Sequence, residues 1–285
     1  MQNERVIEAD RRPGILAKML GSRLQRVREV VGLSYDEAAA QLGREAEWLI
    51  RVETGFTVAS PEEVARVLVE YGVRDAKVAD QIIDMARRVA APPAWLAPHA
   101  FRLTADNRDV LLVEAESTLA QVHGFQYIPP LAQAEGYFRE IAPYLLPECD
   151  VDQEWDLLAS RQAHQPAGVT RLLDVIIDEV AGLLVRGRPE VMADQLRHLL
   201  ELAGSPHATV RVIPREAPLW EKRTCNFDIL SFAGTTDRIG VCYSALGVEL
   251  ARRDIYDEWT AIEGHAAVGP AESKAILERH LAALS

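Results

Sequence analysis

Apolar residues near the start of the chain recur at helical spacing and are interrupted by turn residues. Leu24, Val27 and Val31 repeat every three or four positions, which places them on one face of a helix. Ser34 followed three residues later by Glu37 is the sequence pattern of a capping box, so a second helix is predicted to begin there. Two more short helices are predicted at residues 45–54 and 61–72, and the successive helices end at Gly43, Gly55 and Gly72.

Short helices joined by turns of three or four residues are the organisation of a helix-turn-helix domain. A further helical pattern at residues 76–91 ends at Pro92 and Pro93, because a helix does not continue through two prolines. At the other end, Pro13 and Gly14 discourage an earlier helix. We therefore predict a flexible arm at residues 1–17, a helix-turn-helix domain at 18–91 and a linker at 92–107.

The rest of the chain mixes helical and strand patterns. Residues 189–203 begin with Pro189 and are followed by Gly204, which is the usual asymmetry of a helix. Apolar runs rich in β-branched residues predict strands within 169–185 and at 209–213, 226–232 and 238–243. Helical spacing of apolar residues predicts further helices at 109–123, 131–145, 152–165, 248–267 and 271–284. The fold class is therefore α+β: an N-terminal all-α helix-turn-helix bundle, then a mixed α/β domain at 108–285 with a small sheet covered by helices.

Four N-terminal segments carry a resemblance to a known family. The segments LGSRLQRVRE, GLSYDEAAAQLG, IRVETG and EVARVLVEYGV resemble, in order and spacing, the Xre (Cro and phage-repressor-like) helix-turn-helix regulators of the actinobacterial type. The resemblance implies that the helix after Gly43 lies in the DNA major groove and that Glu53 is a structural acid near its end. The DNA-binding residues that it implies are Tyr35, Arg44, Glu47, Trp48 and Arg51.

The charge of this region favours a second hypothesis. Glu45 and Glu47 place carboxylates toward a polyanion, and only Arg44 and Arg51 on this helix oppose them. Residues 1–74 hold 11 Lys or Arg against 12 Asp or Glu, whereas DNA-binding domains of this size are normally basic. The alternative is a helical bundle that has kept its core and lost its DNA-binding surface.

The C-terminal part also resembles a known domain. The segments IPPLAQAEGYF, DEVAGLLVRGRPEVMADQLRHLLELA, VRVIP and FDILSF resemble the C-terminal domain that accompanies many actinobacterial Xre-type regulators. That domain has no known biochemical function and is discussed beside a small partner protein. The resemblance therefore implies a domain that binds a small molecule or docks a small partner protein.

Composition restricts the surroundings and the chemistry. The net charge of −12 lies almost entirely on residues 75–285, so this part should not bind nucleic acid or an anionic membrane unaided. Three cysteines without a CxxC pair, and the lack of a signal sequence or a long apolar stretch, predict a cytoplasmic protein that does not enter a membrane. The seven histidines show no metal-ligand spacing and no nucleotide or phosphate motif is found, so we expect no metal and no cofactor.

Polar and aromatic side chains lie at the ends of the predicted C-terminal elements, where a ligand pocket between helices and sheet can form. A His or Glu in such a pocket can act as a general acid or base on a bound metabolite. The candidate residues are His123, Tyr127, Glu135, Tyr137, Arg161, His164, Glu179, Trp220, Cys225 and Tyr243.

Two functions follow from these patterns. The first is a homodimeric Xre-type transcriptional regulator that binds DNA and whose C-terminal domain senses a small molecule or docks a partner protein. The second is a repurposed relative that has lost DNA binding and binds or transforms a biosynthetic small molecule, as a cofactor-free cyclase or isomerase. A protein-docking module with neither DNA nor ligand is a third interpretation.

Overall fold

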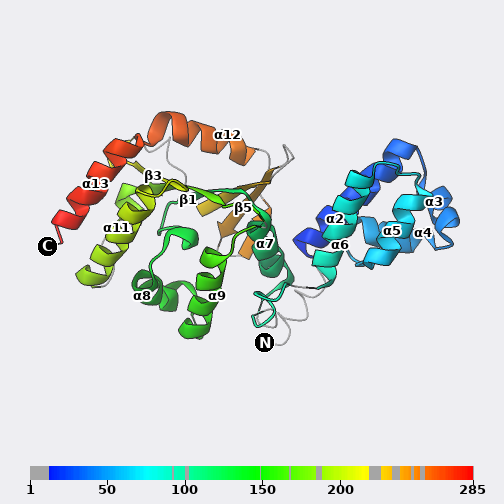
Figure 1. Cartoon of the computed structure of the whole chain (residues 1–285), viewed down its shortest axis with the longest axis horizontal. Helices are drawn as coiled ribbons and strands as arrows, with labels where there is room; N and C mark the ends of the chain where they lie inside the picture. Colours follow the sequence, from blue (N-terminus) through cyan, green and yellow to red (C-terminus); the bar gives the residue numbers. More distant parts are fainter. Residues whose placement is uncertain are drawn as a thin grey trace. The chain divides into compact units, whose positions relative to one another are not determined.

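The computed structural model describes residues 13–91, 93–99, 103–147, 149–166, 168–183, 188–217, 226–232, 238–244, 247–250 and 254–284. The chain divides into two compact units, Met1–Val113 and Glu114–Ser285 (Figure 1). Trp220 and Cys225, two of the predicted pocket residues, lie outside the described residues. So do residues 1–12 of the predicted arm.

The N-terminal unit is built from helices that follow the predicted pattern. They are α2 (Ile15–Val31), α3 (Tyr35–Leu42), α4 (Ala46–Glu53), α5 (Pro61–Glu70) and α6 (Ala76–Ala90), and α7 (Ala105–Glu116) contains the division between the units. Ser34 and Ser60 each form a complete capping box, with Glu37 and Glu63 respectively, so local sequence sets where α3 and α5 begin. The core of this unit includes Leu24, Leu49 and Leu68.

Helix α2 begins at Ile15, three residues before the predicted start of the helix-turn-helix domain at residue 18. Ile15 and Leu16 are buried, and Gly14 at the N-cap offers no side chain to satisfy the first amides. The Asp109 carboxylate accepts a hydrogen bond from the Leu16 amide at 2.8 Å and supplies the missing acceptor from α7. The helix thus begins directly after Pro13 and Gly14, the two residues that discourage an earlier start, and the tertiary cap satisfies its first turn.

The C-terminal unit contains a mixed sheet in the order β3-β2-β1-β4-β5-β6. The neighbours β1, β2 and β3 run parallel, and β1–β4, β4–β5 and β5–β6 are antiparallel pairs. The strands are β1 (Leu119–Gly124), β2 (Leu172–Asp178), β3 (Ala208–Ile213), β4 (Asn226–Ser231), β5 (Arg238–Ser244) and β6 (Gly247–Leu250). Strands β2 to β5 confirm the four predicted strands to within a few residues at each end.

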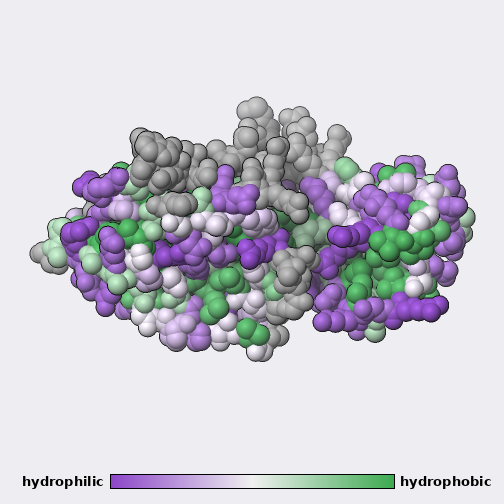
Figure 2. Space-filling view, turned by 90° about the horizontal axis from the view of Figure 1, so that it is seen from above, coloured by the Kyte–Doolittle hydropathy of each residue, from purple (hydrophilic) through white to green (hydrophobic). Residues whose placement is uncertain are grey.

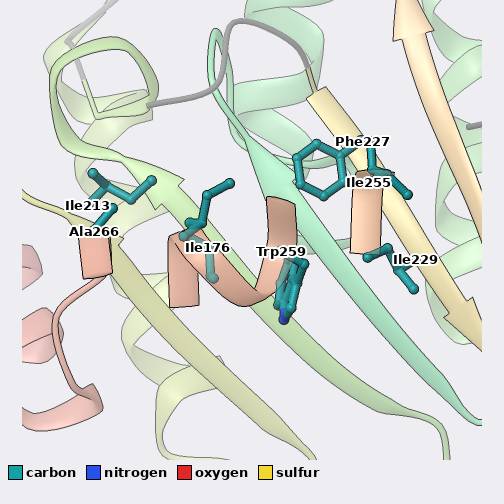
Figure 3. Close-up of a cluster of buried hydrophobic side chains, with 8 residues drawn as sticks. Ile176, Ile213, Phe227, Ile229, Ile255, Trp259 and Ala266 are labelled. Carbon is teal, nitrogen blue, oxygen red and sulfur yellow. The ribbon is translucent and has the colours of Figure 1, made fainter. Parts of the chain in front are cut away.

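Helices cover both faces of this sheet. One face packs against α12 (Asp254–Ala261) and the π-helix η4 (Ile262–Ala266) through a cluster that includes Ile176, Phe227 and Trp259 (Figure 3). Figure 1 shows α8 (Glu135–Leu145), α9 (Val151–Ala163) and α11 (Pro189–Ala203) on the other side. The short η2 (Pro130–Ala132) and α10 (Glu179–Gly182), and the last helix α13 (Pro270–Ala282), complete the unit.

The predicted helix at residues 109–123 is wrong in its second half, because α7 ends at Glu116 and β1 begins at Leu119. Strand β1 pairs with β2 on one side and β4 on the other, and both of its faces are covered. A strand buried on both faces lacks polar alternation, so its apolar residues also fit a helical period. The predicted helix at 248–267 is also wrong at its start, since residues 247–250 pair with β5 as the edge strand β6.

Among the described residues, a helix with the length and apolar character needed to cross a bilayer is not found.

Candidate functional site

Helix α4 is held against α2 by close backbone contact. A Cβ atom on Gly21 would lie 2.3 Å from the Glu53 carbonyl oxygen, so only glycine allows the two helices to approach this closely. Gly55, directly after α4, has a φ of +81° and would place a Cβ 2.8 Å from the Lys18 backbone nitrogen. Both glycines therefore fix the position of α4 on the bundle.

A buried ion pair joins the same two helices. Arg28 donates from Nε and Nη2 to the two carboxylate oxygens of Glu53, each at 2.8 Å, and from Nη1 to the Leu33 carbonyl oxygen at 2.8 Å. The hydrogen bonds to Glu53 raise the pKa of Arg28. Because such a bidentate pair is directional, it fixes the rotation of α4 as well as its distance from α2. Glu53 is therefore a structural acid, as the sequence resemblance implied.

Tyr35 was predicted to contact DNA, and it lies at the start of α3 against this ion pair. The Arg28 guanidinium carbon is 3.9 Å from the centre of the Tyr35 ring, which is a cation–π distance. Tyr35 is half-buried, and burial raises the pKa of its hydroxyl. Its ring therefore supports the ion pair that orients α4.

The other predicted DNA-binding residues are presented on or beside α4. Arg44 lies just before the helix, where Nη2 donates to Glu63 Oε1 at 2.6 Å and the guanidinium carbon is 4.9 Å from the centre of the Trp48 ring. Arg51 donates from Nε to Thr57 Oγ1 at 3.2 Å. Arg44, Glu47 and Arg51 are exposed and Trp48 is half-buried. The exposed surface at α4 thus presents Arg44 and Arg51 for contact with DNA, but Arg44 is already paired with the Glu63 carboxylate.

A second site lies in the C-terminal unit, on the face of the sheet opposite to Trp259. Asp228 of β4 is 5% exposed, and its Oδ2 accepts a hydrogen bond from the Tyr243 hydroxyl of β5 at 2.6 Å. Burial raises the pKa of Asp228 to about 7, and the Tyr243 hydrogen bond offsets only part of this shift. Burial and the Asp228 charge also raise the pKa of Tyr243. A carboxyl group with a pKa near neutrality can accept or release a proton under cellular conditions.

Glu114 and Arg161 form an ion pair beside Asp228. Arg161 of α9 donates from Nε and Nη2 to the carboxylate of Glu114, at 3.1 and 2.7 Å. Burial disfavours the charge of Arg161, but the Glu114 carboxylate outweighs it and the pKa of Arg161 is raised. The charges of Glu114 and Arg161 both act on Asp228 and Tyr243. Residues from α7, α9, β4 and β5 therefore form one electrostatic cluster.

Tyr127 and Asn226 extend this cluster along the sheet. The Asn226 side chain lies near the Tyr127 hydroxyl and opposes the rise in the pKa of Tyr127 that burial causes, and its Oδ1 accepts the Phe125 amide at 2.7 Å. Asn226 lies directly opposite Tyr243 in the antiparallel β4–β5 pair, so both side chains emerge on the same face. Burial raises the pKa of Tyr127, and the Asp228 charge adds to this shift. We call Asp228, Tyr243, Asn226, Tyr127, Glu114 and Arg161 the Asp228 cluster.

Comparison with known families identifies both parts of the chain. A model of the domain of unknown function DUF5753 matches residues 107–279, which is more than half of the sequence. The chain belongs to the DUF5753 family. A helix-turn-helix domain model matches residues 19–81. No curated protein and no solved structure matches the chain.

The chain therefore consists of a helix-turn-helix domain followed by a DUF5753 domain, the arrangement that the two resemblances predicted. The helix-turn-helix domain indicates a DNA-binding regulator. The family match assigns no biochemical function to the DUF5753 domain.

Three of the predicted pocket residues belong to the Asp228 cluster: Tyr127, Arg161 and Tyr243. His123 does not, because it pairs with Phe227 in the β1–β4 register and side chains alternate between faces along a strand. Its ring centre is 4.9 Å from that of Phe227, on the face covered by α12. His123 and Asp228 therefore lie on opposite sides of the sheet.

The remaining predicted residues occupy separate places in the DUF5753 domain. Glu179 accepts the Arg215 amide at 2.8 Å and lies 3.0 Å from His280 Nε2 on α13. Glu135 is exposed and paired with Arg139 along α8. The Tyr137 hydroxyl accepts the Ile128 amide at 3.3 Å, and the His164 carbonyl oxygen accepts from Arg171 at 2.9 Å.

Sequence reasoning missed Asp228, Glu114 and Asn226. No motif surrounds them, and Glu114 lay inside a helix that was predicted to continue to residue 123. Asp228 did carry a signal, because it is an acid in the middle of the apolar strand NFDILS. An acid in a strand buried on both faces has to find a partner or a function.

Proposed function

We propose that the protein is a DNA-binding transcriptional regulator of the Xre type whose DUF5753 domain senses a small molecule or docks a small partner protein. The observation that carries the DNA-binding part is the placement of α4. The Arg28–Glu53 pair and Gly21 hold this helix rigidly, and Arg44, Trp48 and Arg51 remain on or near its surface. A rigid helix with exposed arginines is what major-groove recognition requires.

In this proposal Arg44 and Arg51 contact phosphates or base edges, and Trp48 packs beside them. To contact DNA, Arg44 has to break or share its ion pair with Glu63, which reduces the free energy gained from its contact with DNA. Glu47 repels the DNA backbone, so binding depends on a small number of arginine contacts. We therefore expect modest affinity with a shallow dependence on salt concentration.

The test is fluorescence anisotropy of the full chain with labelled DNA from upstream of its own gene and with random duplex, at two salt concentrations. The expected result is tighter binding to the upstream DNA, weakened by salt and by Arg44→Ala and Arg51→Ala. Arg197→Ala is the matched control, because Arg197 is an exposed arginine of α11 that also pairs with a carboxylate. No binding at low salt, or equal loss in all three variants, would contradict the proposal.

We also propose that the regulator acts as a homodimer. Large apolar side chains are exposed in the N-terminal unit, including Val30 at 81% and Val69 at 72%, together with Phe56 and Val58. Figure 2 shows hydrophobic residues gathered on the displayed side of this unit. Sedimentation velocity of the full chain tests this part, and a monomer at micromolar concentration would exclude it.

A second candidate is the repurposed relative without DNA binding, and the Asp228 cluster is the observation that favours it. A buried carboxyl group with a pKa near 7, hydrogen-bonded to a tyrosine, has the properties of a general acid or base for a cofactor-free cyclisation or isomerisation. The test is exchange of metabolite protons for deuterium in D2O. Exchange promoted by the native chain and abolished by Asp228→Asn, in a protein that does not bind DNA, would establish this candidate.

A further inference from the structure

The two carboxylate oxygens of Asp228 have different surroundings. Oδ2 accepts the Tyr243 hydroxyl at 2.6 Å, whereas none of the described residues donates a hydrogen bond to Oδ1. The side chain is nonetheless almost completely withdrawn from bulk solvent. Oδ1 is not one of the fully buried unpaired atoms of the described residues, so water or a ligand can reach it and complete the hydrogen bonding of the carboxylate.

Among the described residues, the cation that acts on Asp228 is Arg161, which is already paired. Arg161 uses Nε and Nη2 for the Glu114 carboxylate, so the pair is balanced within itself. The other neighbours of Asp228 are the hydroxyls of Tyr243 and Tyr127 and the amide of Asn226, all of which are neutral. When Asp228 is ionised, the cluster has two carboxylates and one guanidinium. A second buried guanidinium, that of Arg171, donates to the Glu114 carbonyl oxygen and lies beside the Glu114–Arg161 pair, whereas Arg161 is the described cation whose charge acts on Asp228.

Tyr127 and Tyr243 are partly exposed, whereas Asp228 and Asn226 are buried. Tyr243 is in direct contact with Asp228, and Tyr127 reaches Asn226, the neighbour of Tyr243 across the β4–β5 pair. Aromatic rings beside a carboxylate are a common setting for organic cations, because ring faces attract positive charge.

We propose that the Asp228 cluster binds a small protonated amine, whose ammonium group donates to Asp228 Oδ1 and lies beside the rings of Tyr127 and Tyr243. An ammonium supplies both the missing donor and the missing charge. A carboxylate ligand would add a third negative charge, and a neutral ligand would leave the ionised Asp228 unbalanced. This inference rests on the part of the proposed function in which the DUF5753 domain senses a small molecule, and it names the chemical class of that molecule.

The experiment uses the full chain with n-butylamine and cadaverine as probes, at pH 8 and constant ionic strength. Butyrate and n-butanol have the same carbon skeleton as n-butylamine and serve as the anionic and neutral controls. Binding is measured by isothermal titration and by the shift of the thermal midpoint. We expect both amines to bind and to raise the midpoint with concentration, and the two controls to give no shift.

Asp228→Asn keeps an acceptor for Tyr243 but removes the charge, so it is expected to weaken amine binding at least tenfold. Asp194→Asn removes an exposed carboxylate of α11 and is expected to leave binding unchanged. Tyr243→Phe keeps the ring and removes the donor to Oδ2, and a several-fold loss is expected. This second variant provides an independent measurement if Asp228→Asn folds poorly.

Failure of the native chain to bind either amine would overturn the inference, as would equal binding of n-butylamine and n-butanol. Unchanged affinity in both cluster variants would place the amine elsewhere and overturn it too. These titrations contain no DNA, so their outcome is separate from the anisotropy measurement. Amine binding without DNA binding would support this inference while contradicting the regulator.

Discussion

Glu53 of the N-terminal unit and Asp228 of the C-terminal unit are both buried carboxylates, but their partners differ. Both oxygens of Glu53 accept from Arg28, which also binds the Leu33 carbonyl oxygen. Asp228 has one tyrosine hydroxyl and an open second oxygen. Burial raises the pKa of Asp228 to about 7, whereas the Glu53 carboxylate is held on both oxygens by the guanidinium of Arg28.

The difference separates a structural acid from a functional one. A buried charge with a complete set of partners fixes the geometry of the elements that carry it, and here it orients α4. A buried acid without a countercharge reduces the stability of the fold, and perturbed groups of this kind are concentrated at functional sites. The following changes test this comparison, from the largest expected effect to the smallest.

Arg28→Ala should cause the largest loss of stability, of about 3–5 kcal/mol in the N-terminal unit, because it leaves the Glu53 carboxylate buried without a partner. Urea unfolding followed by circular dichroism measures the loss. Arg44→Ala is the control, since it breaks the partly exposed pair with Glu63 and should cost about 0–1 kcal/mol. Similar losses in the two variants would show that the buried Arg28–Glu53 pair contributes no more to stability than a partly exposed pair.

Asp228→Asn should have the opposite sign and stabilise the protein above neutral pH. The unfolded chain releases the Asp228 proton near pH 4, whereas the folded chain keeps it until about pH 7. Stability therefore falls as the pH rises from about 4 to about 7, by at most about 4 kcal/mol for this group. Asparagine has no such proton to release.

The measurement is the urea midpoint of the native chain and of Asp228→Asn at pH 8 and at pH 5. The variant should be clearly more stable at pH 8, and the difference should shrink at pH 5. Asp194→Asn, an exposed acid, should change the midpoint little at either pH. Equal midpoints at pH 8 would mean that burial of Asp228 carries no penalty.

Gly21→Ala tests the close approach of α2 and α4 on which the Glu53 pair depends. The new methyl group would lie 2.3 Å from the Glu53 carbonyl oxygen, so the helices must separate at a cost of about 1–3 kcal/mol. Gly136→Ala in α8 is the control, because its methyl group meets only Val191 Cγ1 at an ordinary 3.7 Å. A thermal midpoint that drops in both variants would point to a general effect of the substitution.

Ser34→Ala should have the smallest effect, a loss of about 1 kcal/mol, because it removes the capping box that begins α3. Neither buried acid takes part in this cap. Thermal unfolding measures the loss, and Ser60→Ala, which removes the matching cap of α5, should lower the midpoint by a similar amount. A loss of stability as large as that of Arg28→Ala would mean that Ser34 also stabilises the position of α4.

The N-terminal unit was predictable because its signals are local. Ser34 with Glu37 and Ser60 with Glu63 mark helix starts within four residues, and positive φ at Gly32 and Gly43 marks the stops. The apolar spacing then places Leu24 and its equivalents in the core. These signals reflect hydrogen bonds between residues a few positions apart, so the residues that form them can be read directly from the sequence.

The C-terminal strands β2 to β5 were also visible as β-branched runs, but β1 and β6 were not. β1 lies between β2 and β4 in a sheet whose two faces are covered by helices, so the successive residues Val122, His123 and Gly124 are all buried. Burial on both faces removes the alternation that identifies a strand. Residues 247–250 form β6 through antiparallel pairing with β5. Strand pairing over long sequence separations decided these elements.

The amino-acid sequence by itself determined the helix-turn-helix bundle and the α+β class, because each follows from local spacing and composition. Only the tertiary structure decided which polar side chains meet. Asp228 and Tyr243 meet through the register of β4 and β5, and Arg161 reaches Glu114 from a helix 47 residues further along the chain. The register also sends His123 to the opposite face. A one-residue shift in pairing would exchange the two faces of a strand, and no local pattern specifies that choice.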